Sequence, residues 1–474
     1  MISYIKINGF KSFNNFEMEF TPFTVIAGTN ASGKSNLFDA FKLLGRLAET
    51  DNLKKAFKEQ RGEFMELFTL YGDNEYASEM EFCVEMLVNK KVKDAWGNAT
   101  NLKYTRLRYE LKIKRFTNGT GIEDLEVTYE HLENLRHQED RWIKLIPKKN
   151  LEDWRPKVIT GKRGIPYIQT EVENGIPTVQ VPQDGTTGNK RRFPLKNASR
   201  TVLSSFDTID FPHVFAAKEE MRSWKFLELN PEDLRHPTSK NTGEDELSQS
   251  GRNLAAVLNR IKQEDSYSLK EISRKLQTFL PNFIDVDVID DTENKQYLIK
   301  LKDKDKKEYS SRVLSEGTLR ILTLCILEYD NKHTGLLCFE EPENGIHPFR
   351  IGAMGKLLKD LCADFTYPDM PLRQVIVNTH SPIMVGNILE LYLNDSNVSI
   401  HLSQMVNRVT TIGGLKRKIS VTIMDNPFSG YQENDSFGGI FTEQEQENKR
   451  KHAKAKVKNY LETNAFESLI EKLN

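Results

Sequence analysis

A glycine-rich loop near the amino terminus has the residue types and spacing of a phosphate-binding site. Residues 28–35 read Gly-Thr-Asn-Ala-Ser-Gly-Lys-Ser, a complete G-x-x-x-x-G-K-S pattern. In this pattern backbone N–H groups surround phosphate oxygens, the lysine reaches the β- and γ-phosphates, and the serine hydroxyl meets Mg²⁺. An apolar strand at 23–27 and a helix from residue 36 would flank the loop, as this mechanism requires. The expected nucleotide-binding residues are Asn30, Ala31, Ser32, Gly33, Lys34, Ser35 and Asn36.

Two acids and a histidine follow apolar runs later in the chain. Glu340 and Glu341 come directly after the run at 335–339, and His380 follows the run at 374–378. Such runs alternating with helices indicate a parallel sheet covered on both faces, whose strand ends meet at one edge. Phosphoryl transfer to water needs charge neutralisation, a metal and an oriented water. We expect Ser35 and Glu340 to hold Mg²⁺, Glu341 to orient or deprotonate the water, and His380 to contact the γ-phosphate.

Each of these signals also has a less specific interpretation. Acids at a strand end are commonly solvated, and a lone histidine is more often structural than catalytic. The segment at 314–318, Leu-Ser-Glu-Gly-Thr, is weak by itself because Ser-x-Gly turns cap many helices. This segment becomes informative only through its position in the chain, after the glycine-rich loop and before the acids and the histidine.

Taken together, these segments resemble the RecF/SMC-like ABC ATPases, specifically the short bacterial ATPases of the AAA_21 type. The similarity rests on residues 28–36, 314–318, 339–348 and 378–382, and on a helix at 250–258. It implies ATP and Mg²⁺ as cofactors and a head-to-tail homodimer or higher homo-oligomer. In that dimer Ser315 and the Gly317 amide would close on the γ-phosphate bound to the opposite subunit.

The resemblance also implies a biological setting. Short members often occur in bacterial antiphage modules of the Septu, retron or PARIS kind, where the ATPase holds or licenses a separate nuclease or toxin. A nuclease within this chain is not expected, because the stretch after Pro382 lacks the acid cluster of Toprim nucleases.

The chain departs from the wider pattern at three points. Glu340 stands where many ABC proteins have aspartate, and Glu316 and Thr318 stand where transporters have glycine and glutamine. A carboxylate is still available to Mg²⁺, so we expect hydrolysis that is slow. No glutamine-loop residue is evident, and Gln60 and Arg61 are weak candidates.

The expected fold is α/β: an ABC-type ATPase head with a mixed or parallel core sheet flanked by helices. An antiparallel β subdomain and a helical lobe carrying the 314–318 segment would complete it, with no long coiled coil, because no sustained heptad run occurs. We expect an N-terminal ATPase lobe at 1–129 and an irregular family-specific insertion at 130–245. A C-terminal ATPase lobe at 246–400 and an extension at 401–474, ending in an amphipathic helix, would follow.

Composition leaves several alternatives open. The 474 residues carry a net charge of −1, which neither supports nor excludes nucleic-acid binding. A RecF-like DNA-repair ATPase is therefore the main alternative, with basic clusters at 190–192 and 449–451, although such runs are more often solvated. A third alternative is a scaffold that binds ATP for structural stability and does not hydrolyse it. No apolar run reaches transmembrane length and the four cysteines lack metal spacing, so we expect a cytoplasmic protein that makes no membrane contact.

Overall fold

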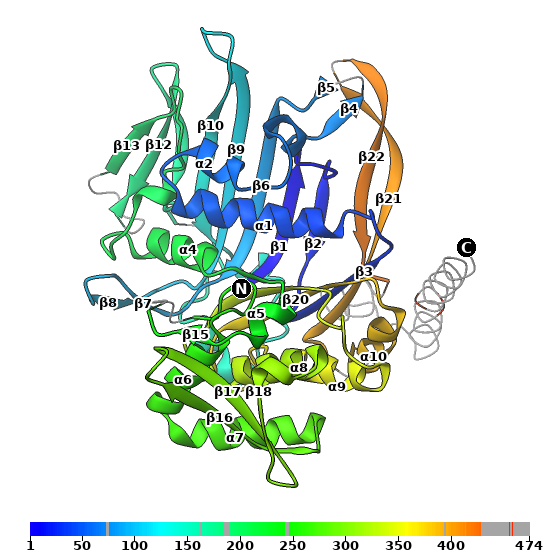
Figure 1. Ribbon diagram of the computed structural model, residues 1–474. Coiled ribbons are helices and arrows are strands. Elements are labelled where there is room, and N and C mark those ends of the chain that lie inside the picture. Colours follow the sequence, from blue (N-terminus) through cyan, green and yellow to red (C-terminus); the bar gives the residue numbers. More distant parts are fainter. Residues whose placement is uncertain are drawn as a thin grey trace, which may run out of the picture.

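Figure 1 shows the computed structural model, in which two large sheets contribute residues to one apolar cluster, and a second cluster covers the other face of the core sheet. The structure describes residues 1–427 except 73–74, 162–163, 184–189, 242–245, 393–394 and 413, together with Ala455 and Val457. Across these described residues, no helix is both long and apolar enough to cross a membrane.

The core sheet has six strands in the order β14-β19-β20-β3-β21-β22. The first five run parallel, and β22 is antiparallel to β21. Alternate residues of the buried strands point to opposite faces: Cys338 joins one apolar cluster and Phe339 the other. This confirms the mixed sheet covered on both faces. The strands are β14 (Lys225–Leu227), β19 (Gly335–Glu340), β20 (Arg373–Thr379), β3 (Phe23–Gly28), β21 (Val398–Ile412) and β22 (Leu415–Asp425).

Helices cover the two faces of this sheet. One apolar cluster contains residues of α1 (Lys34–Glu49) and α4 (Pro212–Arg222). The cluster on the opposite face contains residues of α8 (Glu316–Glu328), α9 (Pro348–Asp360) and α10 (Pro382–Tyr392). The loop that precedes α1 is therefore held between a buried strand and a buried helix.

A second, antiparallel sheet has the strand order β10-β9-β6-β1-β2 and shares an apolar cluster with α1. It confirms the expected antiparallel β subdomain. Its strands are β1 (Ile2–Asn8), β2 (Phe16–Glu19), β6 (Glu79–Leu87), β9 (Arg106–Thr117) and β10 (Glu123–Asn134). Two short hairpins flank it, β4 (Leu70–Gly72) with β5 (Glu75–Tyr76) and β7 (Lys91–Lys93) with β8 (Ala99–Asn101). A short helix, α2 (Leu53–Lys58), follows α1.

The expected helical lobe lies below the core sheet in Figure 1 and leads into α8. Its two main helices have 11 and 14 residues, so the described chain contains no long coiled coil. Its elements are α5 (Pro231–Arg235), β15 (Thr238–Ser239), α6 (Leu254–Glu264), α7 (Ser266–Phe279), β16 (Phe283–Asp291), β17 (Gln296–Asp303) and β18 (Glu308–Ser310).

The expectation of an irregular segment after residue 130 is wrong for its second half. A three-stranded sheet forms there from β11 (Gln169–Glu173), β12 (Ile176–Pro182) and β13 (Lys190–Pro194), preceded by the short helix α3 (Leu151–Trp154). Its first turn is Asn174-Gly175, with φ of 50° and 80°, the pairing that two-residue hairpins favour.

Two expected boundaries fall inside strands. The division between residues 129 and 130 cuts β10, and the division between 400 and 401 cuts β21. Moreover, β14 from the expected insertion pairs with β19 and forms one edge of the core sheet. The expected C-terminal amphipathic helix lies outside the described residues.

Candidate nucleotide-binding site

The glycine-rich loop connects β3 to α1, as the sequence predicts. Gly33 precedes α1 with φ of 90°, a left-handed conformation that favours glycine. A Cβ at Gly33 would also collide with the side chain of Thr422 on β22. Ser403 Oγ of β21 donates a hydrogen bond of 2.9 Å to Ser32 O. The loop is thus braced by the β21–β22 hairpin as well as by its own strand and helix.

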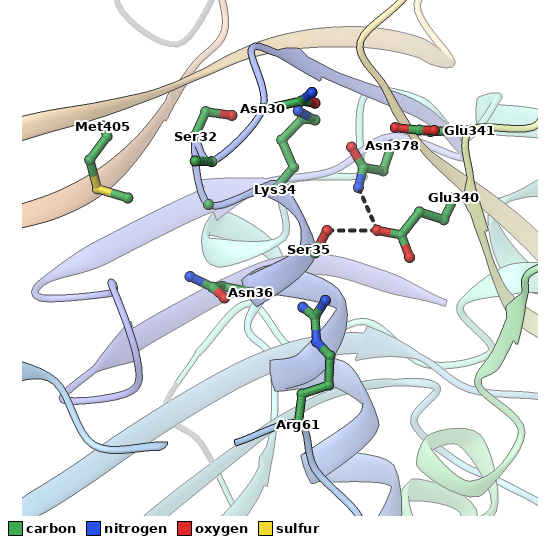
Figure 2. Close-up of a pocket in the computed structure, with 12 residues that line it drawn as sticks. Asn30, Ser32, Lys34, Ser35, Asn36, Arg61, Glu340, Glu341, Asn378 and Met405 are labelled. Carbon is green, nitrogen blue, oxygen red and sulfur yellow. Dashed lines mark hydrogen bonds between the residues drawn. The ribbon is translucent and has the colours of Figure 1, made fainter. Parts of the chain in front are cut away.

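The loop lines a cavity of about 280 Å³, shown in Figure 2. All seven nucleotide-binding residues expected from the sequence face it. The remaining lining residues come from distant parts of the chain: Arg61, Glu340, Glu341, Asn378 and Met405.

Lys34 is 6% exposed, and its Nζ donates to two carbonyl oxygens of its own loop. The distances are 2.7 Å to Gly28 O and 2.8 Å to Thr29 O. Burial lowers the pKa of Lys34, while the nearby Glu341 and Glu340 carboxylates oppose that shift. A buried ammonium favours an added anion, so this lysine fits the phosphate contact expected of it.

Ser35 and Glu340 meet at the edge of the sheet (Figure 2). Ser35 Oγ donates to Glu340 Oε1 over 2.6 Å, and Asn378 Nδ2 reaches the same oxygen at 3.3 Å. Hydroxyl and carboxylate oxygens are the hard ligands that Mg²⁺ accepts, with phosphates and water completing its shell. The described residues contain no group of three or more His, Cys, Asp or Glu that could hold a metal. The oxygen atoms of Ser35 and Glu340 fit Mg²⁺ bound together with a nucleotide, whose phosphates would supply further ligands.

Glu341 lies at a strained turn just after β19. Its φ of 47° is left-handed, and its N–H donates to Asn378 O over 2.8 Å. Its two carboxylate oxygens bond to His380 Nδ1 at 2.8 Å and Asn344 Nδ2 at 2.9 Å. Burial alone would raise the pKa of Glu341, but the hydrogen bonds from Asn344 and His380, together with the charges of His380 and Lys34, outweigh it and lower the pKa. The lowered pKa favours the carboxylate form of Glu341, which lines the cavity.

The structure brings His380 to Glu341 but does not itself show contact with a phosphate. The side chain of His380 is 47% exposed, as expected of a site that opens to solvent. Asn378 and Asn344 are additional site residues that sequence reasoning missed. Their signal was positional: Asn378 lies two residues before His380 near the end of β20, and Asn344 lies three residues after Glu341.

The two weak glutamine-loop candidates behave differently. Gln60 Nε2 donates to Ala56 O over 3.2 Å, and Gln60 does not line the loop cavity. Arg61 does line it and is anchored by Asp39, whose carboxylate lies 2.8 Å from Arg61 Nη2. Lys11 Nζ binds the same carboxylate at 2.6 Å. One buried acid therefore holds two cations beside the loop.

The 314–318 segment lies outside this cavity within one chain. Ser315 is the exposed N-cap of α8, and its Oγ accepts a 3.3 Å hydrogen bond from the Thr318 N–H. Gly317 packs against the turn after the acids, since a Cβ there would lie 2.8 Å from Gly345 O. The structure thus does not bring Ser315 or Gly317 to Lys34 of the same chain.

A second cavity of about 720 Å³ adjoins the first, because Asn36 and Arg61 line both. Phe68, Tyr71 and Tyr76 provide aromatic rings along its wall, and Lys11 and Lys418 provide charge. A flat apolar group attached to phosphates could occupy it.

The fold and the loop together define an ATPase of the ABC type with a P-loop. The chain belongs to the AAA_21 family, described as an AAA domain, putative AbiEii toxin, Type IV TA system, whose model matches residues 23–385. This confirms the family expected from the sequence. None of the curated proteins matches the sequence.

Solved structures with similar folds include three SMC heads. An SMC head bound to the C-winged helix domain of ScpA is 13% identical with a TM-score of 0.45, covering 89% of this chain and 98% of that one. The SMC head domain from Thermotoga maritima is 12% identical with a TM-score of 0.38, covering 90% and 99%. An SMC head with an extended coiled coil, bound to a ScpA C-terminal domain derived from Pyrococcus furiosus, is 12% identical with a TM-score of 0.42, covering 90% and 96%.

Proposed function

We propose that this protein binds and hydrolyses ATP with Mg²⁺ as a head-to-tail dimer, and that the dimer controls a separate effector, a nuclease or toxin, in bacterial antiphage defence. One observation carries the proposal. Lys34, the Ser35–Glu340 pair and Glu341 line one cavity, with His380 hydrogen-bonded to Glu341. Ser315, by contrast, is exposed outside this cavity. A second copy could supply Ser315 to the terminal phosphate.

Each residue has a defined task in this proposal. Lys34 and the loop amides neutralise the phosphates, and Ser35 with Glu340 holds Mg²⁺, which adds charge neutralisation when bound. Glu341, ionised at neutral pH, accepts a proton from the attacking water or orients it. Asn344 and His380 fix its two oxygens, so that little reorganisation is needed at the moment of reaction.

The aromatic cavity is the proposed place for the base of the nucleotide. Stacking on an aromatic ring contributes about 1–3 kcal/mol per base. Tyr71→Ala should therefore weaken ATP binding about tenfold or more while leaving tripolyphosphate binding unchanged. Lys34→Ala should abolish binding of both. Isothermal titration calorimetry on the three proteins separates these outcomes, and equal loss of both ligands in Tyr71→Ala contradicts this base site.

Light scattering coupled to size-exclusion chromatography tests the dimer. Glu341→Gln should bind ATP without hydrolysing it, and should shift to twice the monomer mass when ATP and Mg²⁺ are added. Ser315→Arg in the Glu341→Gln background should stay monomeric, since a bulky cation would occupy the proposed contact. An unchanged mass for Glu341→Gln with and without ATP would argue against the shared site.

Support for an effector comes from the family alone, whose description names a putative toxin and a toxin–antitoxin system. The test is affinity purification with products of the neighbouring genes, followed by phage plating with wild type and Lys34→Ala. Loss of protection in Lys34→Ala is expected. Protection that is independent of Lys34 would contradict control by ATP.

Cytoplasmic residence is part of the proposal. Cys325, Cys338 and Cys362 are buried as free thiols, and Cys83 is free and partly buried. Burial raises the pKa of Cys83 to about 12, so this thiol resists oxidation. Free thiols suit a reducing compartment.

The basic cluster at residues 190–192 gives little support to the DNA-repair alternative. Lys190 Nζ donates to Gln180 Oε1 over 2.7 Å, and Arg191 lies over the ring of Phe211. Arg192 has its own partner, Glu173, at 3.6 Å. Each cation of this cluster already has a local contact. The cluster at 449–451 lies outside the described residues.

A further inference from the structure

The short hairpin formed by β7 and β8 holds a tryptophan in solvent. Trp96 lies in the turn between the two strands and is 70% exposed, although tryptophan is highly buried on average. Residues 90–103, hereafter the tryptophan hairpin, contain four lysines and one acid, in a protein whose net charge is −1. These lysines are exposed and form no ion pair with any described residue: Lys90, Lys91, Lys93 and Lys103.

The register of the hairpin places two of the lysines on its outer face. Val92 lies between Lys91 and Lys93 on β7, so the two lysines point to the face opposite Val92. Val92 is 8% exposed and belongs to the apolar cluster that contains α1. A Cβ at Gly97 would lie 3.8 Å from Lys93 Cε, which places this lysine beside the turn. The hairpin is therefore anchored in the core by one face, while the other carries positive charge up to the turn.

Hydrogen bonds within the turn order the backbone that carries Trp96. Asp94 is 6% exposed, and its Oδ1 accepts from the backbone N–H groups of Trp96 at 3.0 Å and Asn98 at 2.9 Å. Gly97 has φ of 87°, and its N–H donates to Asp94 O over 3.0 Å. A side chain on a turn that is already ordered costs less conformational entropy when it is bound. Because Trp96 takes part in these bonds only through its backbone, alanine at this position keeps them.

We propose that the tryptophan hairpin docks a separate protein, which presents an apolar pocket for Trp96 and carboxylates around that pocket for Lys91 and Lys93. Tryptophan is enriched among the residues that dominate protein–protein affinity, and charged residues occupy the polar rim around such anchors. Lysines without intramolecular partners complement an acidic rim. This inference rests on the proposed function, which requires a separate effector, and it identifies the surface that holds the effector.

Two other occupants fit the hairpin less well. A single myristoyl chain binds a membrane only marginally, and one indole ring buries less apolar area than that chain. Proteins that bind single-stranded nucleic acid stack successive bases on aromatic side chains along a groove, whereas residues 90–103 contain one aromatic side chain. A protein partner is therefore the occupant that this surface favours.

The tryptophan hairpin lies away from the nucleotide site. None of residues 90–103 lines either cavity beside the glycine-rich loop. Figure 1 shows β7 and β8 on the left of the molecule, whereas β21 and β22, which brace the loop, lie on the right. Substitution of Trp96 should therefore leave ATP binding unchanged.

Biolayer interferometry with the purified product of each neighbouring gene tests the docking surface. Trp96→Ala should weaken binding of the effector about 30-fold or more, as expected of a central anchor. The double variant Lys91→Gln, Lys93→Gln should weaken binding at low salt and have a smaller effect at about 0.5 M salt, because exposed ion pairs are screened.

Matched controls come from exposed residues elsewhere on the chain. Tyr367→Ala removes another exposed aromatic ring, 62% exposed, and Lys304→Gln with Lys307→Gln removes two exposed lysines from the turn between β17 and β18. Both controls should bind the effector with near wild-type affinity. Calorimetric ATP binding by Trp96→Ala should match wild type, which separates loss of the docking surface from loss of the fold.

The possible outcomes distinguish this inference from the proposed function. Equal effector binding by wild type and Trp96→Ala would overturn the docking surface and leave control of an effector intact. If wild type binds none of the neighbouring gene products, effector control itself is contradicted. Tighter binding of wild type to phosphatidylserine vesicles or to a single-stranded oligonucleotide, or self-association that is lost in Trp96→Ala, would also overturn the inference, because the hairpin would then have another occupant.

Discussion

Replacing the carboxylate of Glu341 by an amide isolates its chemical role from its structural one. Glutamine has nearly the same volume and keeps one acceptor oxygen, so at most one of the hydrogen bonds to His380 and Asn344 is lost. A neutral hydrogen bond contributes about 1 kcal/mol, which sets the expected loss of stability. A general base contributes about 10²–10⁴ in rate, or about 3–5 kcal/mol of transition-state free energy. The substitution should therefore raise the activation free energy of hydrolysis by more than it lowers the free energy of unfolding.

The assay is single-turnover phosphate release with protein in excess over ATP. We expect Glu341→Gln to release phosphate at least 100-fold more slowly than wild type, with ATP affinity within about threefold. Glu343→Gln is the matched control: Glu343 is 6% exposed, accepts a hydrogen bond from Thr379 Oγ1 and does not line the loop cavity. Near-normal release by Glu341→Gln, or an equal loss in Glu343→Gln, would refute the reasoning.

Three further outcomes follow from local geometry and charge. Because the pKa of Glu341 is lowered, the hydrolysis rate should stay constant from neutral pH down to the ordinary glutamate range and fall only below it, as a pH–rate profile would show. Burial raises the pKa of Glu130 to about 7. The contribution of Glu130 to the free energy of unfolding, about 3 kcal/mol, is therefore fully present below the unfolded pKa near 4.5 and is lost as pH rises through 7. Glu130→Gln should remove this part of the pH dependence in urea unfolding. Gly33→Ala should lower the free energy of unfolding by about 1–3 kcal/mol, because alanine resists φ of 90° and its Cβ meets Thr422; an unchanged urea midpoint would contradict this.

Contiguous signals made much of the site predictable from sequence. The loop at 28–35 carries its own strand and helix, so its position needs no distant information. Glu340, Glu341 and His380 could be placed together because parallel strands end at one edge, and the register of Glu340 opposite Asn378 agrees with that placement. Their roles in hydrolysis stay predictions.

Non-local pairing explains what the sequence did not reveal. Nothing within residues 398–412 indicates that they pair with β3, because that register is fixed by a strand 375 residues earlier in the chain. Most of β21 was therefore assigned to an extension rather than to the core. The Asn174-Gly175 turn, by contrast, was a readable hairpin signal, but the surrounding glycines suggested an irregular segment instead. The role of Ser315 in a site shared with a second subunit stays a prediction, while within one chain its side chain caps α8.

The resting position of Lys34 bears on which ligands the protein can retain. Its ammonium already satisfies two of its three protons on Gly28 O and Thr29 O, so a ligand must offer something better than two neutral oxygens. A β,γ-diphosphate provides full negative charge at that point, whereas a monophosphate ends short of it. A nucleotide without a β-phosphate offers Lys34 no charge to replace these two carbonyl contacts, so AMP is expected to compete poorly with ATP.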